Sequence, residues 1–157
     1  MNSPLRRSIA VAALVLAPVL SSCGFNQPTD RVYNPGVGVN ERSGSVDVLN
    51  ALVVSGSDGS GTLVASLSNN DSAEADRLTE VTGSGEDAGL QVAGRGVDVK
   101  PGGSVSLPND GKFSVQGDAV STGAFLELTF RFERGDAVTV EVPVVDRRGP
   151  YTDVPVP

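Results

Sequence analysis

The sequence has no histidine and no tryptophan, and it has one cysteine and one methionine among its 157 residues. Without histidine neither a Ser-His-Asp triad nor a Cys-His pair can form, which excludes the commonest routes of nucleophilic catalysis. A Ser-Lys dyad would have to use Lys100 or Lys112, and no other feature of the sequence supports one. The residue inventory therefore predicts a protein that is not an enzyme.

A single cysteine also means that no disulfide can form within the chain, so the stability of the fold must come from burial of apolar side chains. Aromatic residues are scarce, because the sequence has two tyrosines and no tryptophan. Stacking on sugars or a large aromatic contact surface for a protein partner is not expected from this composition.

The N-terminal residues differ from the rest of the chain. Arg6 and Arg7 precede an apolar run over residues 9–20 that is broken only by Pro18. A basic start followed by an apolar stretch of this length is typical of a secretory signal. The run is too short for a comfortable membrane span, which needs about 20 apolar residues.

Leu20, Ser21, Ser22 and Cys23 resemble the lipobox of bacterial lipoprotein precursors. The resemblance implies that Cys23 receives a diacylglyceryl group and that residues 1–22 are then removed. Two acyl chains anchor a protein firmly, since each buried methylene contributes about 0.8 kcal/mol. We therefore expect attachment to the extracytoplasmic face of the cell membrane through lipid on Cys23. The alternative is an ordinary signal peptide with an accidental cysteine.

The chain is acidic, with 19 Asp and Glu against 12 Lys and Arg and a net charge of −7. Removal of the signal takes away Arg6 and Arg7 but no acidic residue, so the remaining chain is more negative still. Nucleic acid is not an expected partner, because its phosphates need basic side chains. Solubility at the cell surface explains the charge better than an acidic binding face does.

Composition divides the chain into four segments. Residues 1–22 are the signal, and residues 23–42, rich in Asn, Pro and Gly, are a flexible tether in which Val37 and Val39 suggest the start of an edge strand. Residues 43–146 form one β-sandwich domain. Residues 147–157 contain three prolines and little apolar area, which predicts an extended or disordered tail.

Two-residue periodicity predicts two β-hairpins. Residues 46–54 and 62–68 flank a glycine-rich turn over residues 56–61. Residues 126–132 and 138–144 alternate apolar and polar side chains, which is typical of half-buried antiparallel strands. Pro143 lacks an amide donor and fits an edge position or a strand end.

Shorter strands are expected around Leu78, residues 90–99, Val105 and Phe113, and no segment shows a convincing helical pattern. Seven to nine short strands separated by turns predict an all-β fold, an antiparallel sandwich of immunoglobulin-like or cupredoxin-like type. Its core would contain the aliphatic residues of these strands together with four phenylalanines: Phe113, Phe125, Phe130 and Phe132.

Oxygen-rich segments occur at Asp58, at residues 69–71 and at Glu86 with Asp87. A calcium site needs about six to eight oxygens from a tight loop, and none of these segments has EF-hand spacing. Turn formation explains them better, and a solvated loop explains Glu86 and Asp87 better than acid–base chemistry does. No phosphate-binding glycine motif opens a helix. The sequence predicts no metal site and no cofactor.

Three segments resemble the PCu(A)C copper chaperone family, an exported cupredoxin-like β-sandwich, and more closely the actinobacterial lipoproteins grouped with it. They are GTLVASLSNNDSAEADRLTEV, VDVKPGGSVSL and FLELTFRFERGDAVTVEVPVV. The matching motifs are the D-x-L start of a strand at Asp76 and Leu78, the turn at residues 101–103, and the final hairpin. The resemblance covers residues 46–145 and rests on structural motifs, so it bears on fold more than on function.

The resemblance implies a copper(I) site made of a His-Glu-Met type segment and a His-x-Met pair. These would fall at residues 83–89 and near Lys112 and Ser114, where the sequence has neither histidine nor methionine. The one methionine is Met1, in the signal. Copper(I) prefers thioether and imidazole ligands, and carboxylates bind it poorly. The family's copper(I) activity is therefore not expected here.

Together these observations predict a membrane-anchored extracytoplasmic lipoprotein that acts as a non-enzymatic binding or scaffold module. An extracytoplasmic protein partner would contact the loops at one end of the sandwich. Candidate contact residues are Asp58, Glu86, Asp87, Asn109 and Asp110. The alternative is a lipoprotein of copper homeostasis that uses an unfamiliar oxygen-based site or assists a partner chaperone.

Overall fold

A computed structural model describes residues 36–56, 59–110 and 112–157, without the side chains of residues 109 and 110. The expected signal, Leu20, Ser21, Ser22, Cys23 and Asp58 lie outside the described residues, as do the side chains of Asn109 and Asp110. In the described part of the chain no helix is long and apolar enough to span a membrane.

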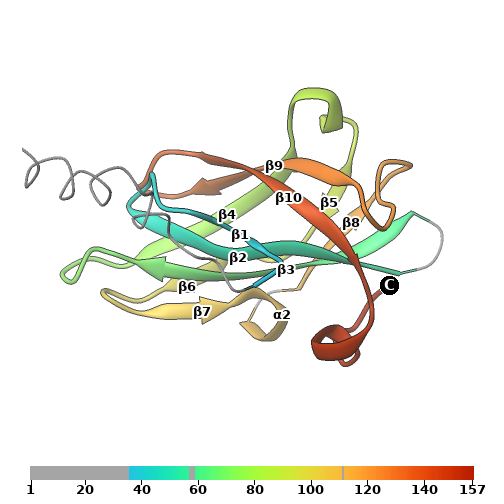
Figure 1. Cartoon of the computed structure of the whole chain (residues 1–157). Helices are drawn as coiled ribbons and strands as arrows, with labels where there is room; N and C mark the ends of the chain where they lie inside the picture. Colours follow the sequence, from blue (N-terminus) through green and yellow to red (C-terminus); the bar gives the residue numbers. More distant parts are fainter. Residues whose placement is uncertain (1–35, 57–58, 111) are drawn as a thin grey trace, which may run out of the picture. The chain divides into compact units, whose positions relative to one another are not determined.

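The described residues form an all-β domain, as predicted, with three short helical turns (Figure 1). The helical turns are η2 (Gly85–Asp87), α2 (Leu107–Asp110) and η3 (Gly149–Tyr151). The strands are β1 (Val39–Glu41), β2 (Val46–Ser55), β3 (Ser60–Asn69), β4 (Asp76–Gly83), β5 (Gln91–Ala93), β6 (Val97–Val99), β7 (Ser104–Ser106), β8 (Phe113–Gln116), β9 (Phe125–Phe132) and β10 (Val138–Asp146).

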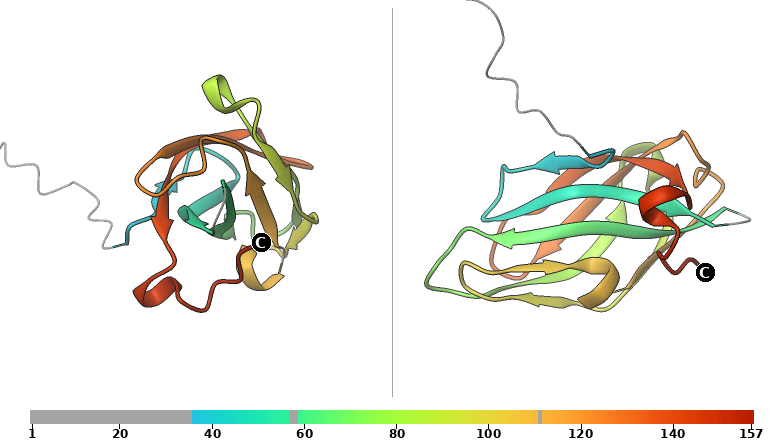
Figure 2. Two further views of the ribbon diagram at one scale, coloured as in Figure 1. Left: turned by 90° about the vertical axis from the view of Figure 1, so that its right-hand side faces the viewer. Right: turned by 60° about the horizontal axis from the view of Figure 1, so that its bottom comes forward.

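Strand β10 joins the two layers of the sandwich. Its first part, from Val138 to Pro143, pairs antiparallel with β9, and its last part, from Val144 to Asp146, pairs parallel with β2. The strand order is therefore continuous, β5-β8-β3-β2-β10-β9-β4-β6, with β1 added to β2 and β7 added to β3. The sheet curls around its core, which is visible end-on in Figure 2.

Pro143 lies inside β10 and is buried, at neither the sheet edge nor the strand end that the sequence predicts. It is the last residue of β10 to pair with β9, opposite Phe125, and the next residue pairs with β2. Because the strand changes partners at this point, an absent amide hydrogen disturbs neither hydrogen-bond ladder.

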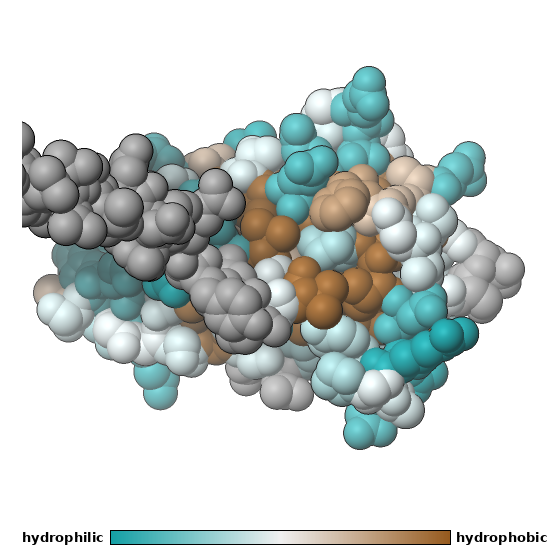
Figure 3. Space-filling view, viewed as in Figure 1, coloured by the Kyte–Doolittle hydropathy of each residue, from teal (hydrophilic) through white to brown (hydrophobic). Residues whose placement is uncertain are grey.

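The core contains the inward residues of both layers, including Leu126, Leu128, Phe130 and Phe132 of β9 as predicted. Phe125 was expected in the core but is 60% exposed, because it precedes Leu126 by one residue and points to the opposite face of the strand. Among the described residues, the exposed large apolar ones are Val37 and Phe125. Figure 3 shows apolar residues, coloured brown, grouped among polar ones on the face seen in Figure 1.

The end of the expected tether forms β1, which pairs antiparallel with β2. Asn50 bulges from β2 with a φ of 51°, and its amide donates a hydrogen bond of 2.6 Å to Asn40 Oδ1. A Cβ on Gly38 would lie 2.5 Å from the carbonyl carbon of Asn50, so only glycine allows this close approach. The edge strand that Val37 and Val39 suggest thus begins at Val39 and is held by contacts with β2.

The C-terminal tail is ordered, in contrast to the extended or disordered tail that its composition predicts. It forms η3 and then folds back, so that Thr62 Oγ1 on β3 donates a hydrogen bond of 2.6 Å to the carbonyl of Pro155. The outer face of the sheet supplies the contact surface that the short tail lacks by itself.

Candidate functional site

Two segments that the resemblance links to metal binding lie next to each other in the fold. Strand β5, which follows the loop of residues 83–89, pairs with β8, so that Ala93 lies opposite Ser114. Ser114 Oγ donates a hydrogen bond of 3.3 Å to the carbonyl of Ala93, and the exposed Lys112 directly precedes β8. A hydroxyl and an ammonium group replace the soft ligands here, so these residues do not fit copper(I).

The loop of residues 83–89 is fastened to β9 at Glu127. Ser84 Oγ donates a hydrogen bond of 2.7 Å to Glu127 Oε1, and Asp87 Oδ2 accepts one of 2.8 Å from the Glu127 amide. Glu86 on the same loop is exposed. Of the two acidic residues on this loop that are predicted as partner contacts, Asp87 therefore has a structural role and Glu86 is exposed.

Of the three loops expected at one end of the sandwich, the β2–β3 turn and the loop of residues 83–89 both lie close to Gly117. The amide of Gly117, at the end of β8, donates a hydrogen bond of 3.0 Å to the carbonyl of Gly59 in the turn between β2 and β3. A Cβ on Gly117 would lie 2.5 Å from Leu90, where the loop of residues 83–89 ends. Figure 1 places α2 next to the start of β8.

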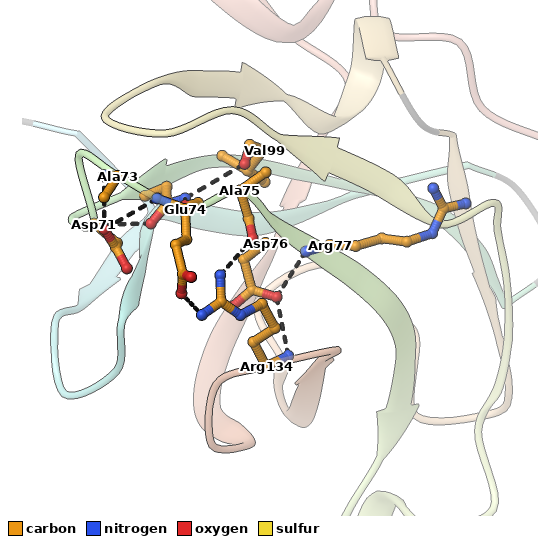
Figure 4. Close-up of polar contacts among 9 residues, drawn as sticks. Asp71, Ala73, Glu74, Ala75, Asp76, Arg77, Val99 and Arg134 are labelled. Carbon is orange, nitrogen blue, oxygen red and sulfur yellow. Dashed lines mark hydrogen bonds and ion pairs between the residues drawn. The ribbon is translucent and has the colours of Figure 1, made fainter.

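A polar cleft of about 310 Å³ lies between the β3–β4 connection and the β9–β10 turn. Its acidic residues are Asp71, Glu74, Asp76 and Asp136, and Arg134 supplies a cation. The sequence analysis noted residues 69–71 as oxygen-rich, but it did not connect them with Arg134. The side chains of this cluster, apart from Asp136, are shown in Figure 4.

Asn69 and Asp71 use their side-chain oxygens to build the connection between β3 and β4. Asp71 Oδ1 accepts hydrogen bonds from the amides of Ala73 (2.8 Å) and Glu74 (3.1 Å). Asn69 is buried; its Oδ1 accepts from the amide of Asp71 (2.9 Å), and its Nδ2 donates to the carbonyl of Glu74 (2.8 Å). These are local turn contacts, in agreement with the prediction that turn formation explains this segment.

Asp76 connects this corner to the distant β9–β10 turn. It is 7% exposed, and its Oδ1 accepts hydrogen bonds from the amides of Arg77 (2.7 Å) and Arg134 (3.1 Å). The guanidinium of Arg134 forms an ion pair with Glu74 and donates to the carbonyl of Ala75 at 3.3 Å (Figure 4). The D-x-L motif marked Asp76 in the sequence, but its partner 58 residues away carries no local signal.

The cleft therefore has a structural role. In the described part of the chain, no buried side-chain nitrogen or oxygen lacks a hydrogen-bond partner. No group of three or more His, Cys, Asp or Glu side chains within residues 36–56, 59–110 and 112–157 is arranged to hold a metal ion. The cleft has neither a nucleophile paired with a base nor a set of ligands for a cation.

No protein-family model and no curated protein matches the sequence. Solved structures do match: a copper-bound PCuAC domain from PmoF2 has a TM-score of 0.56 and 17% identity over 69% of this chain and 98% of that domain. An apo PCuAC domain from PmoF1 matches with a TM-score of 0.56 and 18% identity over 69% and 99% of the two chains. The domain formed by the described residues therefore has a PCuAC-like, cupredoxin-like fold.

Proposed function

We propose that the protein is a non-enzymatic binding module with a PCuAC-like fold, held by lipid on Cys23 at the extracytoplasmic face of a membrane. The observation that carries the proposal is the chemistry at the two segments where the resemblance places copper ligands. Residues 83–89 bind Glu127 of β9, Lys112 directly precedes β8, and Ser114 lies on it. The fold is kept while the soft donor atoms are absent.

The charge near β8 supports the same conclusion. Lys112 is exposed and would repel a copper cation, whereas thioether and imidazole groups would bind it. The carboxylates of the fold are hard ligands, and those of the β3–β4 corner already accept hydrogen bonds from backbone amides. A role in binding another protein, through exposed loop residues such as Glu86, agrees with this inventory.

Support for the membrane anchor comes from the sequence. The leucine, two serines and cysteine at positions 20–23 match the lipobox pattern, and the apolar run precedes them at the expected place. Residues 24–35 lie in the sequence between Cys23 and Gly36, the first described residue, and their Asn- and Pro-containing composition is that of a spacer.

Copper(I) titration of the detergent-purified, full-length protein against a chromophoric chelator tests the loss of the metal site. We expect no binding tighter than micromolar. A matched gain-of-function variant carries Lys112→His together with Ser114→Met, which places an imidazole just before β8 and a thioether two residues further on, within it. This variant is expected to bind copper(I) at least tenfold more tightly than the natural chain. Micromolar or tighter binding by the natural chain that depends on Asp or Glu would favour a copper-homeostasis role.

Site-specific photo-crosslinking on intact cells tests the partner. A crosslinker at Glu86, on the exposed loop, is compared with one at Thr139, which is exposed on the outer face of β10. We expect one dominant protein adduct from position 86 that is absent from position 139. Identical adduct patterns from the two positions would contradict a specific contact at the loop end.

A further inference from the structure

The outer face of β2 and β3 is unusually well buried for a surface of a two-layer fold. Leu52 and Val54 are 0% exposed, yet they lie outside the core cluster to which their neighbours Ala51 and Val53 belong. Alternation along β2 therefore points Leu52 and Val54 to the outer face. The outer face of such a sheet normally meets water and carries polar residues, so another segment must cover this one.

The C-terminal tail covers the part of this face around Val54. Thr62, whose Oγ1 donates to the Pro155 carbonyl, lies directly between Val54 on β2 and Ser114 on β8 and is only 4% exposed. A Cβ on Gly56 would lie 3.4 Å from the Cβ of Val156, so the tail also reaches the end of β2. Both views in Figure 2 show the tail leaving β10 and folding back along the domain.

The tail fills only part of the space available. A cleft of about 240 Å³ remains between the last tail residues and Thr62, Lys112, Phe113 and Ser114 of the sheet. The tail residues that line this cleft are Pro155, Val156 and Pro157. Their prolines restrict φ, and the carbonyls of the segment are free to accept hydrogen bonds. Such a segment binds with little further loss of chain entropy, which is why proline-rich peptides are recurring ligands of shallow grooves.

The tail is held by few contacts. Among the described residues, the Thr62 bond is the one hydrogen bond that joins residues 152–157 to the sheet, and the others join tail residues to one another. Thr152, Asp153, Pro155 and Pro157 are exposed. The tail can therefore leave the groove without disturbing the core.

We propose that this groove binds an extended, proline-containing peptide of a partner protein, and that residues 153–157 act as a strap that competes for it. Lys112 lines the groove and forms no ion pair with a described residue. A peptide that carries an acidic residue before its prolines is therefore favoured. The tail has the same order, because Asp153 precedes Pro155. The inference goes beyond the proposed function, because it adds a ligand class and a segment that regulates access.

The test supplies the tail in trans. A variant that ends after Thr152 keeps η3 and loses the strap. The probe is a labelled synthetic peptide with the sequence TDVPVP, and its binding to the protein is measured by fluorescence anisotropy. We expect the peptide to bind the shortened variant at least tenfold more tightly than the full chain, where the attached strap competes at high effective concentration. A TDVAVA peptide should bind more weakly, and Thr62→Val in the shortened variant should weaken TDVPVP binding about fivefold, the value of one hydrogen bond.

A second measurement uses the intact chain, so that the result does not depend on the shortened variant. Thr62→Val keeps the side-chain shape and removes the hydrogen bond to Pro155. We expect amide exchange at Val154, whose amide donates to the Tyr151 carbonyl at 3.1 Å, to rise about fivefold while exchange at Leu128 is unchanged. Equal peptide binding by both chain lengths, no binding by a folded shortened variant, or unchanged exchange at Val154 would each overturn the proposal. A concentration-dependent dimer that disappears when residues 153–157 are removed would assign the groove to a second copy and overturn the partner assignment.

Discussion

Asp76 shows how a single buried side chain joins two segments that are far apart in the sequence. One of its oxygens accepts the amides of Arg77 and Arg134, which places the β9–β10 turn against the start of β4. Both hydrogen bonds are part-buried and Asp76 itself is buried, so this residue contributes more to stability than an exposed charge does. The Asp of the D-x-L motif, which contributes to the family resemblance, is thus explained by its contacts between the start of β4 and the β9–β10 turn.

We expect Asp76→Ala to lower the free energy of unfolding by about 2–4 kcal/mol, because two backbone donors lose their acceptor in a buried place. The control is Asp98→Ala, which removes an exposed ion pair with Arg77 and should cost less than about 1 kcal/mol. Urea unfolding followed by circular dichroism measures both. Equal losses for the two variants would show that Asp76 has no special role.

Gly83 permits the close approach of the loop that follows β4. A Cβ at this position would lie 2.0 Å from the carbonyl oxygen of Asp87, a distance that no relaxed structure tolerates. Gly83→Ala should therefore displace the loop and destabilise the domain by about 1–3 kcal/mol. Gly89→Ala is the matched control on the same loop, because a Cβ there meets nothing within 4 Å, and its effect should stay within about 0.5 kcal/mol. Thermal unfolding of the two variants checks the difference.

At the scale of elements, the alternation of β9 decides which of its phenylalanines matter. Phe130 is 0% exposed and Phe125 is 60% exposed, although both occur in the same apolar-rich strand. Phe130→Ala should cost about 3–5 kcal/mol through lost burial and a cavity in the core, and Phe125→Ala less than about 1 kcal/mol. Calorimetric unfolding provides the measurement, and a similar cost for both would contradict the assigned faces of the strand.

Long strands with clear periodicity were predictable in position and pairing, whereas the short strands were predictable in position only. The hairpins β2–β3 and β9–β10 follow from alternation and turn residues, and both are confirmed. Strand β1 and the ordered tail depend on contacts with Asn50 and Thr62, which lie 10 and 93 residues away from their hydrogen-bond partners. Local composition cannot reveal such contacts, because their stability comes from a surface that exists only after the sheet has formed.

The candidate site was predictable in its chemistry and only partly in its geometry. The lack of histidine and of a methionine beyond Met1 excludes the soft-metal site whatever the fold. The anchoring of the loop to Glu127 was not foreseen, since Asp87 and Glu127 are 40 residues apart. The Asn69, Asp76 and Arg134 cluster was missed for the same reason.

At the scale of the whole molecule, the proposed lipid on Cys23 determines where the domain works. We expect Cys23→Ala to move the protein from the membrane fraction to the soluble fraction, or to leave the signal attached, because no acyl chains can be added without the thiol. Ser22→Ala is the matched control, since it keeps a small residue before the cysteine and should leave membrane attachment unchanged. Fractionation and intact-mass measurement test both. Membrane attachment of the Cys23→Ala protein with its signal removed would exclude this anchor.

The sequence by itself determined the fold class and the chemistry that is missing, because both follow from composition and from alternation within single strands. The tertiary structure decided what depends on segments meeting across the fold: the change of partners within β10, the burial of Asp76, and the tail at Thr62 beside Val54. Burial is a property of two surfaces in contact, and a single stretch of sequence contains only one of them.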